Sequence, residues 1–218
     1  GTALPKTSLI TAPGDGRLPS RTVDGDTRAN WSRGTDTWTE RSLAERCVTR
    51  GAPKRPGGYN NNFLIVQTAD HVVIMAEQLH GSRIIPLGEG PRLARDIRLW
   101  SGDSWGRWDG ETLVVETTNF THKAEQRPNH LGIYFPVLST GKHLHFVERF
   151  TRVDTDTIDY QFTETDPTVD VRPWTASIPM ARTDDLLFEY ACHEGNYAMT
   201  NGLRGTQAEQ QAADATKD

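Results

Sequence analysis

Two side chains of this sequence could share acid–base chemistry. Glu148 lies between Phe146 and Phe150 in a stretch where polar and apolar residues alternate, so it is expected on an apolar strand face. Such surroundings disfavour the charged form of a carboxyl group and make it a candidate general acid or base. His193 follows Ala191 on the same face of a predicted last strand, and the small alanine leaves space there. If the protein is an enzyme, we expect Glu148 and His193 to lie within about 8 Å of each other.

Three other ionisable side chains are also site candidates. His80 and Glu77, at the end of an apolar run, form a second acid–base set near one rim of the predicted fold. Glu116 shares its strand face with Val114. We assign His80 to catalysis, and Glu77 and Glu116 to ligand binding. The alternative for the carboxylates is a structural ion pair, for which the sequence offers Arg83, Arg152 and Arg172.

Two short motifs resemble known sites but do not meet their requirements. His143 and His145 share one strand face, as a metal site in a sheet requires, but Glu148 has the opposite parity. We therefore predict no metal and place both histidines on the outer face. Residues 102–106 match Gly-x-Ser-x-Gly, but no helical segment follows Ser104. We expect a glycine-rich loop whose Asp and Ser cap backbone amides.

The elements that must position these residues are strands. Alternation is sustained from Tyr59 to Glu194, and the four-residue polar turn 153–156 predicts a hairpin between residues 143–152 and 157–165. The other predicted strands are 61–68, 71–79, 83–87, 112–119, 174–180 and 187–194. The fold class is therefore all-β, with a single antiparallel up-and-down, lipocalin-like barrel favoured and a strongly bent sandwich as the alternative.

This interpretation divides the chain into three parts. Residues 1–58 form an irregular N-terminal arm packed on the barrel, with Trp31 and Trp38 as its expected anchors. Residues 59–195 form the barrel. Residues 196–218 form a C-terminal tail, in which 206–218 should be a short helix or disordered.

Composition excludes several classes of partner. The 218 residues carry a net charge of −5, which gives no general attraction for nucleic acid. Mean hydropathy is −0.61, and no run approaches the roughly 18 apolar residues of a membrane helix, so we expect no membrane insertion. There is no phosphate-binding glycine loop and no cysteine-rich metal spacing, so we predict no cofactor. A small-molecule ligand remains as the expected partner, and homo-oligomerisation is left open.

The two cysteines indicate the compartment. Cys47 and Cys192 could be buried free thiols in a cytosolic protein, or a disulfide that ties the arm to the last strand. We favour the disulfide, and with it an exported, periplasmic or extracellular protein. The first residues have neither a basic nor an apolar signal region, so the signal peptide is expected to be absent from this chain.

Four stretches of the sequence resemble a family of exported bacterial β-rich proteins of unknown function. The stretches are RWDGETLVVETTNF (107–120), VERFTRVD (147–154), RPWT (172–175) and YACHEGNY (190–197). The resemblance extends over roughly residues 47–205. It implies export and supports the disulfide, and it assigns no catalytic residue.

The sequence leads to three functional hypotheses. The first is an exported, cofactor-independent lyase, isomerase or hydrolase that acts on a small aromatic or apolar molecule in a barrel cavity. The predicted lining of this cavity comprises Tyr160, Trp174 and Tyr190. The second is a lipocalin-like binding protein with the same cavity and no turnover. The third is a structural or carbohydrate-contacting surface module, suggested by the six tryptophans.

Overall fold

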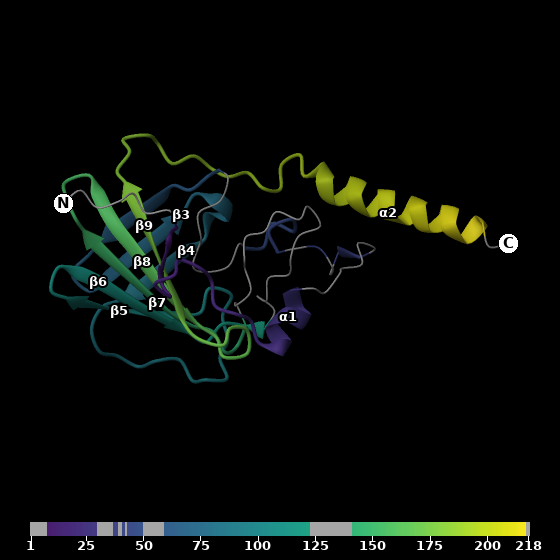
Figure 1. The fold of residues 1–218 in the computed structure, drawn as a ribbon. Coiled ribbons are helices and arrows are strands. Elements are labelled where there is room, and N and C mark those ends of the chain that lie inside the picture. The colour runs from purple at the N-terminus through teal and green to yellow at the C-terminus, as the bar shows by residue number, and fades with distance from the viewer. Residues whose placement is uncertain are drawn as a thin grey trace.

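The structure is a computed structural model that describes residues 8–29, 37–38, 41, 43–49, 59–122 and 141–216. Its described part is rich in β-structure and contains two antiparallel sheets and one long C-terminal helix (Figure 1). The strands are β1 (Ile10–Ala12), β2 (Phe63–Gln67), β3 (His71–Ala76), β4 (Ser82–Pro86), β5 (Asp103–Asp109), β6 (Thr112–Thr118), β7 (His145–Arg152), β8 (Thr157–Thr165) and β9 (Trp174–Ala181). The helices are α1 (Val23–Ala29), the 3-10 turn η2 (Gln78–His80) and α2 (Tyr197–Ala215).

The strand pairing confirms the predicted antiparallel meander. One sheet has the order β1-β9-β8-β7-β6-β5 and the other the order β2-β3-β4. The predicted hairpin is β7–β8, in which Phe150 pairs with Tyr160 and Phe146 with Glu164. The β5–β6 hairpin turns at Gly110, whose φ of +61° favours glycine. Most of the fold is therefore built from neighbours in sequence.

The hydrophobic core lies between the two sheets. Val72 and Ile74 from β3 and Ile85 from β4 belong to the same buried cluster as the inner residues of the six-stranded sheet. The larger members of that inner set are Leu113, Val115, Phe146, Phe150, Tyr160, Phe162 and Trp174. Burial on one face of each sheet offsets the loss of conformational entropy on folding, and the alternating pattern is its sequence signature.

A backbone bridge at Gly106 joins the two sheets. Leu87, just after β4, forms a parallel bridge with Gly106 of β5, and the Gly88 amide donates to the Gly106 carbonyl at 3.0 Å. A Cβ at position 106 would lie 2.8 Å from Leu87 Cδ2, so the glycine permits the approach. The described strands thus form two ladders joined by one bridge, and closure into a barrel stays a prediction.

The predicted last strand, 187–194, is wrong. Residues 182–196 form no strand, and Leu186 and Phe188 are exposed. The free edge of β9 is instead occupied by β1 from the N-terminal arm, with Ile10 opposite Ala176 and the Ser177 amide donating to the Leu9 carbonyl at 2.9 Å. Because β1 pairs with this edge of β9, the later segment cannot pair there.

The arm is more regular than predicted. Besides β1, it contains α1, whose preceding Thr22 accepts a hydrogen bond from the Gly25 amide at 3.0 Å through Oγ1 and donates to the Thr168 carbonyl at 2.7 Å. A Cβ at Gly25 would collide with the Val169 carbonyl oxygen, so glycine lets α1 pack against the β8–β9 connection. In that connection the buried Asp166 accepts from the Thr168 amide and hydroxyl.

The structure describes one of the two tryptophans that were predicted to anchor the arm. Trp31 lies outside the described residues. Trp38 is 57% exposed, with the Arg46 guanidinium 4.7 Å above its ring, so it does not bury itself in the core. The arm is held to the C-terminal region by the predicted disulfide, Cys47–Cys192, which the structure confirms.

The C-terminal helix begins earlier than predicted. It spans 19 residues from Tyr197 and extends away from the two sheets in Figure 1, with no buried residue. Its base lies beside the arm, because Asn196 Nδ2 donates to the Glu45 carbonyl at 3.2 Å. Within the described part of the chain, no helix is both long and apolar enough to cross a membrane.

Candidate functional site

The best-defined polar cluster in the interior joins the two sheets. Glu148, only 1% exposed, accepts hydrogen bonds from Arg83 Nη1 at 2.5 Å and Nη2 at 2.8 Å. The Tyr160 hydroxyl donates to the same carboxylate at 2.9 Å. Arg83 comes from β4, whereas Glu148 and Tyr160 come from β7 and β8. We call these three residues the interior triad.

The interior triad matches the structural ion pair that the sequence left open. Burial lowers the pKa of Arg83, but its charge interaction with Glu148 and the hydrogen bonds to that carboxylate raise the pKa above its usual value overall. The guanidinium therefore remains charged. Both carboxylate oxygens of Glu148 are engaged by donors, a geometry that satisfies a buried charge within the protein.

His193 lies in different surroundings. It is exposed in the turn at residues 192–195, just beyond the disulfide, and not on a strand beside Ala191 as predicted. No hydrogen bond or ion pair within the described residues joins it to Glu148, which faces the core. The local pattern could not reveal this, because the predicted strand face for His193 depended on a strand that does not form.

Of the two rim candidates, His80 lies against the backbone of Tyr190, and Glu77 has a different partner. His80 Nε2 accepts a hydrogen bond from the Tyr190 amide at 3.2 Å. Glu77 is buried, and its Oε2 accepts from Asn62 Nδ2 at 3.0 Å. The contact between His80 and Glu77 is a backbone one, from the His80 amide to the Glu77 carbonyl at 3.4 Å. The Glu77 side chain thus has a partner near β2, whereas the partner of the His80 side chain comes from the segment after β9.

Glu116 lies on the outer face of the six-stranded sheet. It pairs with His145 Nε2 at 2.8 Å, and the two side chains are 49% and 41% exposed. The outer placement of His145 is as predicted. Glu116 does share its face with Val114, which is buried but does not belong to the core cluster that Leu113 and Val115 join from the other face of β6. Glu116 therefore does not line the space between the sheets.

A second outer-face pair gives a prediction about pH. Arg149 Nη2 lies 2.9 Å from Asp109 Oδ2, and this hydrogen bond, followed by the charge of Arg149, lowers the pKa of Asp109. Arg149→Met should raise the Asp109 pKa toward the ordinary value of 3.8, measured by NMR titration of carboxyl shifts. The stability contributed by the pair is present above the unfolded-state pKa and is lost as pH falls through the lower folded-state pKa.

Asp154 is the matched control for that titration. Its pKa is lowered mainly by a hydrogen bond from the Asp156 amide, at 2.8 Å, so Arg149→Met should leave it unchanged. If the pKa of Asp109 is the same in Arg149→Met as in the unmodified protein, Arg149 is not the cause of its lowered value.

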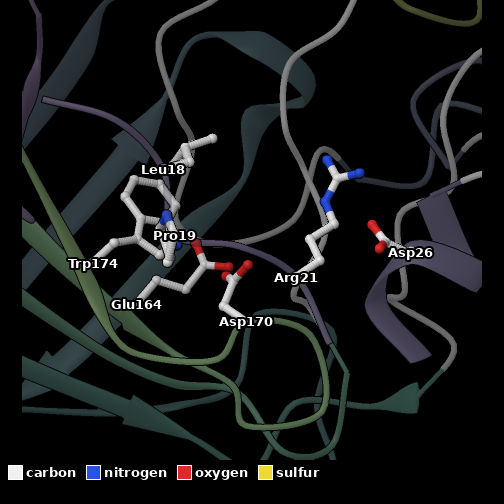
Figure 2. A pocket seen from close by; sticks show the side chains of 7 residues that line it. All are labelled: Leu18, Pro19, Arg21, Asp26, Glu164, Asp170 and Trp174. Carbon is white, nitrogen blue, oxygen red and sulfur yellow. The ribbon is translucent and has the colours of Figure 1, made fainter. Parts of the chain in front are cut away.

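A pocket opens where the arm meets the end of the six-stranded sheet (Figure 2). Its volume is about 210 Å³. Its lining residues are Leu18, Pro19, Arg21, Asp26, Glu164, Asp170 and Trp174. We call it the arm pocket. Glu164 and Trp174 are direct partners across the β8–β9 ladder, and Arg21 forms an isolated antiparallel backbone bridge with Asp170. The sheet, the β8–β9 connection and the arm therefore all contribute to the lining.

Two lining side chains are fixed by the core. Glu164 is 2% exposed, and Trp174 is buried with its ring edge-on to Phe162 at 5.4 Å between centroids. A rigid aromatic wall beside a carboxylate can hold a small molecule by apolar contact and orient it by charge or hydrogen bonding. Trp174 was a predicted ligand-binding residue. Tyr160, predicted to line the same cavity, belongs to the interior triad instead.

The other lining residues were not selected from the sequence. The sequence did contain a signal for Glu164, because this residue shares parity with Tyr160 and Phe162 on an apolar strand face. Arg21, Asp26 and the residues around them carried no periodic signal. They reach the pocket because the arm crosses the β8–β9 connection, where the Thr22 amide donates to the Val169 carbonyl at 2.8 Å.

The serine motif also differs from its prediction. Residues 103–106 lie in strand β5 and not in a glycine-rich loop. Ser104 is buried, with Oγ 2.9 Å from Thr117 Oγ1. Asp103 does accept a backbone hydrogen bond, from the Leu93 amide at 3.2 Å. Among the described residues, no group of three or more His, Cys, Asp or Glu side chains could hold a metal ion.

Several tryptophans lie at the surface in different parts of the fold. Trp38 belongs to the arm, Trp100 precedes β5 and Trp108 lies near the end of β5, and all three are exposed. Trp174, by contrast, is buried at the arm pocket. The arm pocket combines an aromatic wall, a buried carboxyl group and a concave shape. No protein-family model, curated protein or solved structure matches this chain.

Proposed function

We propose that this protein binds a small molecule in the arm pocket and does not turn it over. The observation that carries the proposal is the concave site formed by Trp174 and Glu164 on one side and by the arm on the other. Binding sites combine apolar walls with a few convergent polar groups, and the arm pocket has both. The pocket is small, since about 210 Å³ lies below the roughly 300–1,000 Å³ of typical ligand pockets.

Binding is favoured over catalysis because of the surroundings of the two predicted catalytic residues. The Glu148 carboxylate is engaged by Arg83 and Tyr160, and His193 is exposed beyond the last strand. An acid–base enzyme remains the second candidate, and the specific observation that favours it is the buried Glu164 carboxylate in the pocket wall. A lyase, isomerase or hydrolase reaction would then use Glu164 in place of Glu148.

The proposal includes a lipocalin-like barrel. In support, the bridge between Leu87 and Gly106 joins β4 to β5, so nine strands follow one another from β2 to β1 through the two sheets. The arm pocket would then lie at one mouth of the barrel, a usual position for ligand sites in such folds.

The proposal also includes export and a place in the exported family that the motifs resemble. The Cys47–Cys192 disulfide supports export, because disulfides persist mainly in oxidising compartments.

A pocket-blocking variant tests the proposed binding. Leu18 lines the pocket from the arm, so Leu18→Trp should fill part of its volume and weaken binding of any ligand found by thermal-shift screening at least about tenfold. Leu9→Trp is the matched control, since Leu9 is also exposed on the arm but does not line the pocket.

Dissociation constants from isothermal titration calorimetry decide the outcome. Ligands whose affinity is unchanged by Leu18→Trp would bind elsewhere and would contradict the proposal. Product formation from a bound ligand, followed by mass spectrometry and abolished by Glu164→Gln, would replace the binding function with the enzymatic one.

A further inference from the structure

The part of the arm that lines the arm pocket is held less firmly than the sheet. The sheet residues of the lining belong to the β8–β9 ladder and are buried. The arm residues come from the segment 18–26, which we call the strap. Within the strap, only Pro19 and Gly25 are buried, and Val23 keeps 83% of its surface exposed. A segment with few buried apolar contacts opens locally at a low cost in free energy, so we expect the strap to be the movable side of the pocket.

Hydrogen bonds fasten the strap to the β8–β9 connection. The Thr22 amide donates to the Val169 carbonyl at 2.8 Å. The Val171 amide donates in the other direction, to the Ser20 carbonyl at 3.0 Å. Thr22 Oγ1 adds a side-chain bond to the Thr168 carbonyl at 2.7 Å. These three bonds involve a short piece of the strap, so they can break together without disturbing a strand ladder.

The connection that receives the strap is internally bonded. The buried Asp166 accepts hydrogen bonds through Oδ1 from the Thr168 amide at 2.9 Å and the Thr168 hydroxyl at 2.6 Å. Its carbonyl accepts from the amides of Val169 and Asp170, each at 3.0 Å. The carbonyls that bond to the strap therefore belong to a preorganised turn, and the strap has a fixed surface on which to dock.

Gly25 sets how closely the strap can approach this turn. A Cβ at residue 25 would collide with the Val169 carbonyl oxygen and would lie 3.0 Å from the carbonyl carbon. Because the obstacle is backbone, it cannot move aside as the end of a flexible side chain would. A side chain at this position therefore pushes the strap away from the connection, and Arg21 and Asp26 of the pocket lining move with it.

We infer that the strap docks and undocks while the two sheets stay folded, and that the arm pocket exists only when the strap is docked. The inference rests on the proposed binding function and adds how that site is regulated. A ligand that touches both the strap and the sheet binds the docked state alone, so ligand binding and docking favour each other by the same factor. Thr22 and Gly25 are positioning residues, because they hold the strap without lining the pocket.

Amide hydrogen exchange of the full chain, its disulfide intact, tests the docking. The reporters are the amides of Thr22 and Val171, which bond across the contact, and the reference is the Ser177 amide, which bonds to the arm at Leu9. Gly25→Ala should speed the exchange of both reporters at least about tenfold and leave the reference unchanged. Gly14→Ala is the matched control, since a Cβ there would have nothing within 4 Å. Alanine is the better helix former, so helix propensity alone predicts slower exchange in Gly25→Ala.

Two substitutions of Thr22 isolate its hydroxyl group. Valine loses the bonds that Thr22 Oγ1 makes with the Thr168 carbonyl and the Gly25 amide, whereas serine keeps both. Thr22→Val should speed exchange of the Val171 amide about fivefold, and Thr22→Ser less than about twofold. The urea midpoint of each variant should stay close to that of the unmodified protein, because undocking does not unfold the sheets. A merely structural role would lower the midpoint instead.

Phenol is the probe for the coupling to the pocket, because a single ring suits a volume of about 210 Å³. At about ten times its dissociation constant, phenol should slow exchange of the Thr22 and Val171 amides about elevenfold in the unmodified protein. Titration calorimetry should show at least about tenfold weaker binding of phenol in Gly25→Ala, because docking is blocked, and unchanged binding in Gly14→Ala.

Other outcomes separate the strap from the binding function. Equal exchange rates in Gly25→Ala and Gly14→Ala, or phenol that binds without protecting the two reporter amides, would overturn the strap and leave the binding function standing. A lower urea midpoint in Gly25→Ala, with faster exchange of the Ser177 amide as well, would show that the segment unfolds with the sheets and would also overturn the strap. If neither phenol nor any screened ligand binds, the proposed function is wrong, and the exchange rates without ligand still decide whether the strap undocks.

Discussion

Replacing Arg83 with methionine is expected to lower the free energy of unfolding by about 3–5 kcal/mol. The variant leaves Glu148 buried between the sheets without its bidentate partner, and among the residues that the structure describes only the Tyr160 hydroxyl still donates to that carboxylate. Removing one member of a buried ion pair lowers stability this much because the remaining charge is still buried away from water and has lost its partner. Urea denaturation followed by circular dichroism measures the change, and the m-value shows whether unfolding remains two-state.

A double variant separates the lost partner from the lost packing. Arg83→Met combined with Glu148→Leu removes both charges and should recover most of the lost stability, since buried pairs are often replaceable by apolar residues of similar size. The exposed pair of Arg149 and Asp109 is the control: Arg149→Met should cost at most about 1 kcal/mol. A cost of that small size for Arg83→Met would show that the interior triad is not a stabilising contact between the sheets.

Removing the disulfide should have a comparably large effect. The bond between Cys47 and Cys192 closes a loop with a sequence separation of 145. In the chain-entropy model, opening a loop of that length lowers the free energy of unfolding by at most about 5 kcal/mol. Urea denaturation with and without dithiothreitol should show a clear loss of stability on reduction.

The Cys47→Ser and Cys192→Ser double variant controls for the reductant. It should match the reduced protein in stability and show no response to dithiothreitol. Alkylation of two thiols in freshly purified, unreduced protein, detected by mass, would contradict the disulfide. An unchanged urea midpoint on reduction would contradict the expected stabilisation by the disulfide.

Predictions from alternation succeeded where pairing is local. Phe146, Glu148 and Phe150 share the core-facing side of β7, and their partners on β8 follow from the short turn between the strands. A strand has a period of two residues, so a single hairpin sequence fixes which side chains share a face. This period does not indicate which face of the sheet other elements cover. Glu116 was therefore grouped correctly with Val114 and yet assigned to the wrong side of the sheet.

The structure differs most from the sequence-based predictions where segments far apart in the chain contact each other. Residues 187–194 alternate as a strand should, but β1 from the arm occupies the edge of β9 that they would have joined. The choice between the two segments depends on the packing energy of the whole chain, which local alternation does not encode.

By itself, the sequence determined the β-rich class and the antiparallel hairpins, because these follow from local periodicity, and it favoured a disulfide between its two cysteines over free thiols. Only the tertiary structure decided that Arg83 meets Glu148 and that Arg21 and Leu18 meet Trp174. These partners lie on separate strands or on the arm, and the side chains converge only when the sheets and the arm pack against one another. The arm pocket is such a product of packing, because one wall is a strand pair and the other a segment more than a hundred residues earlier in the chain.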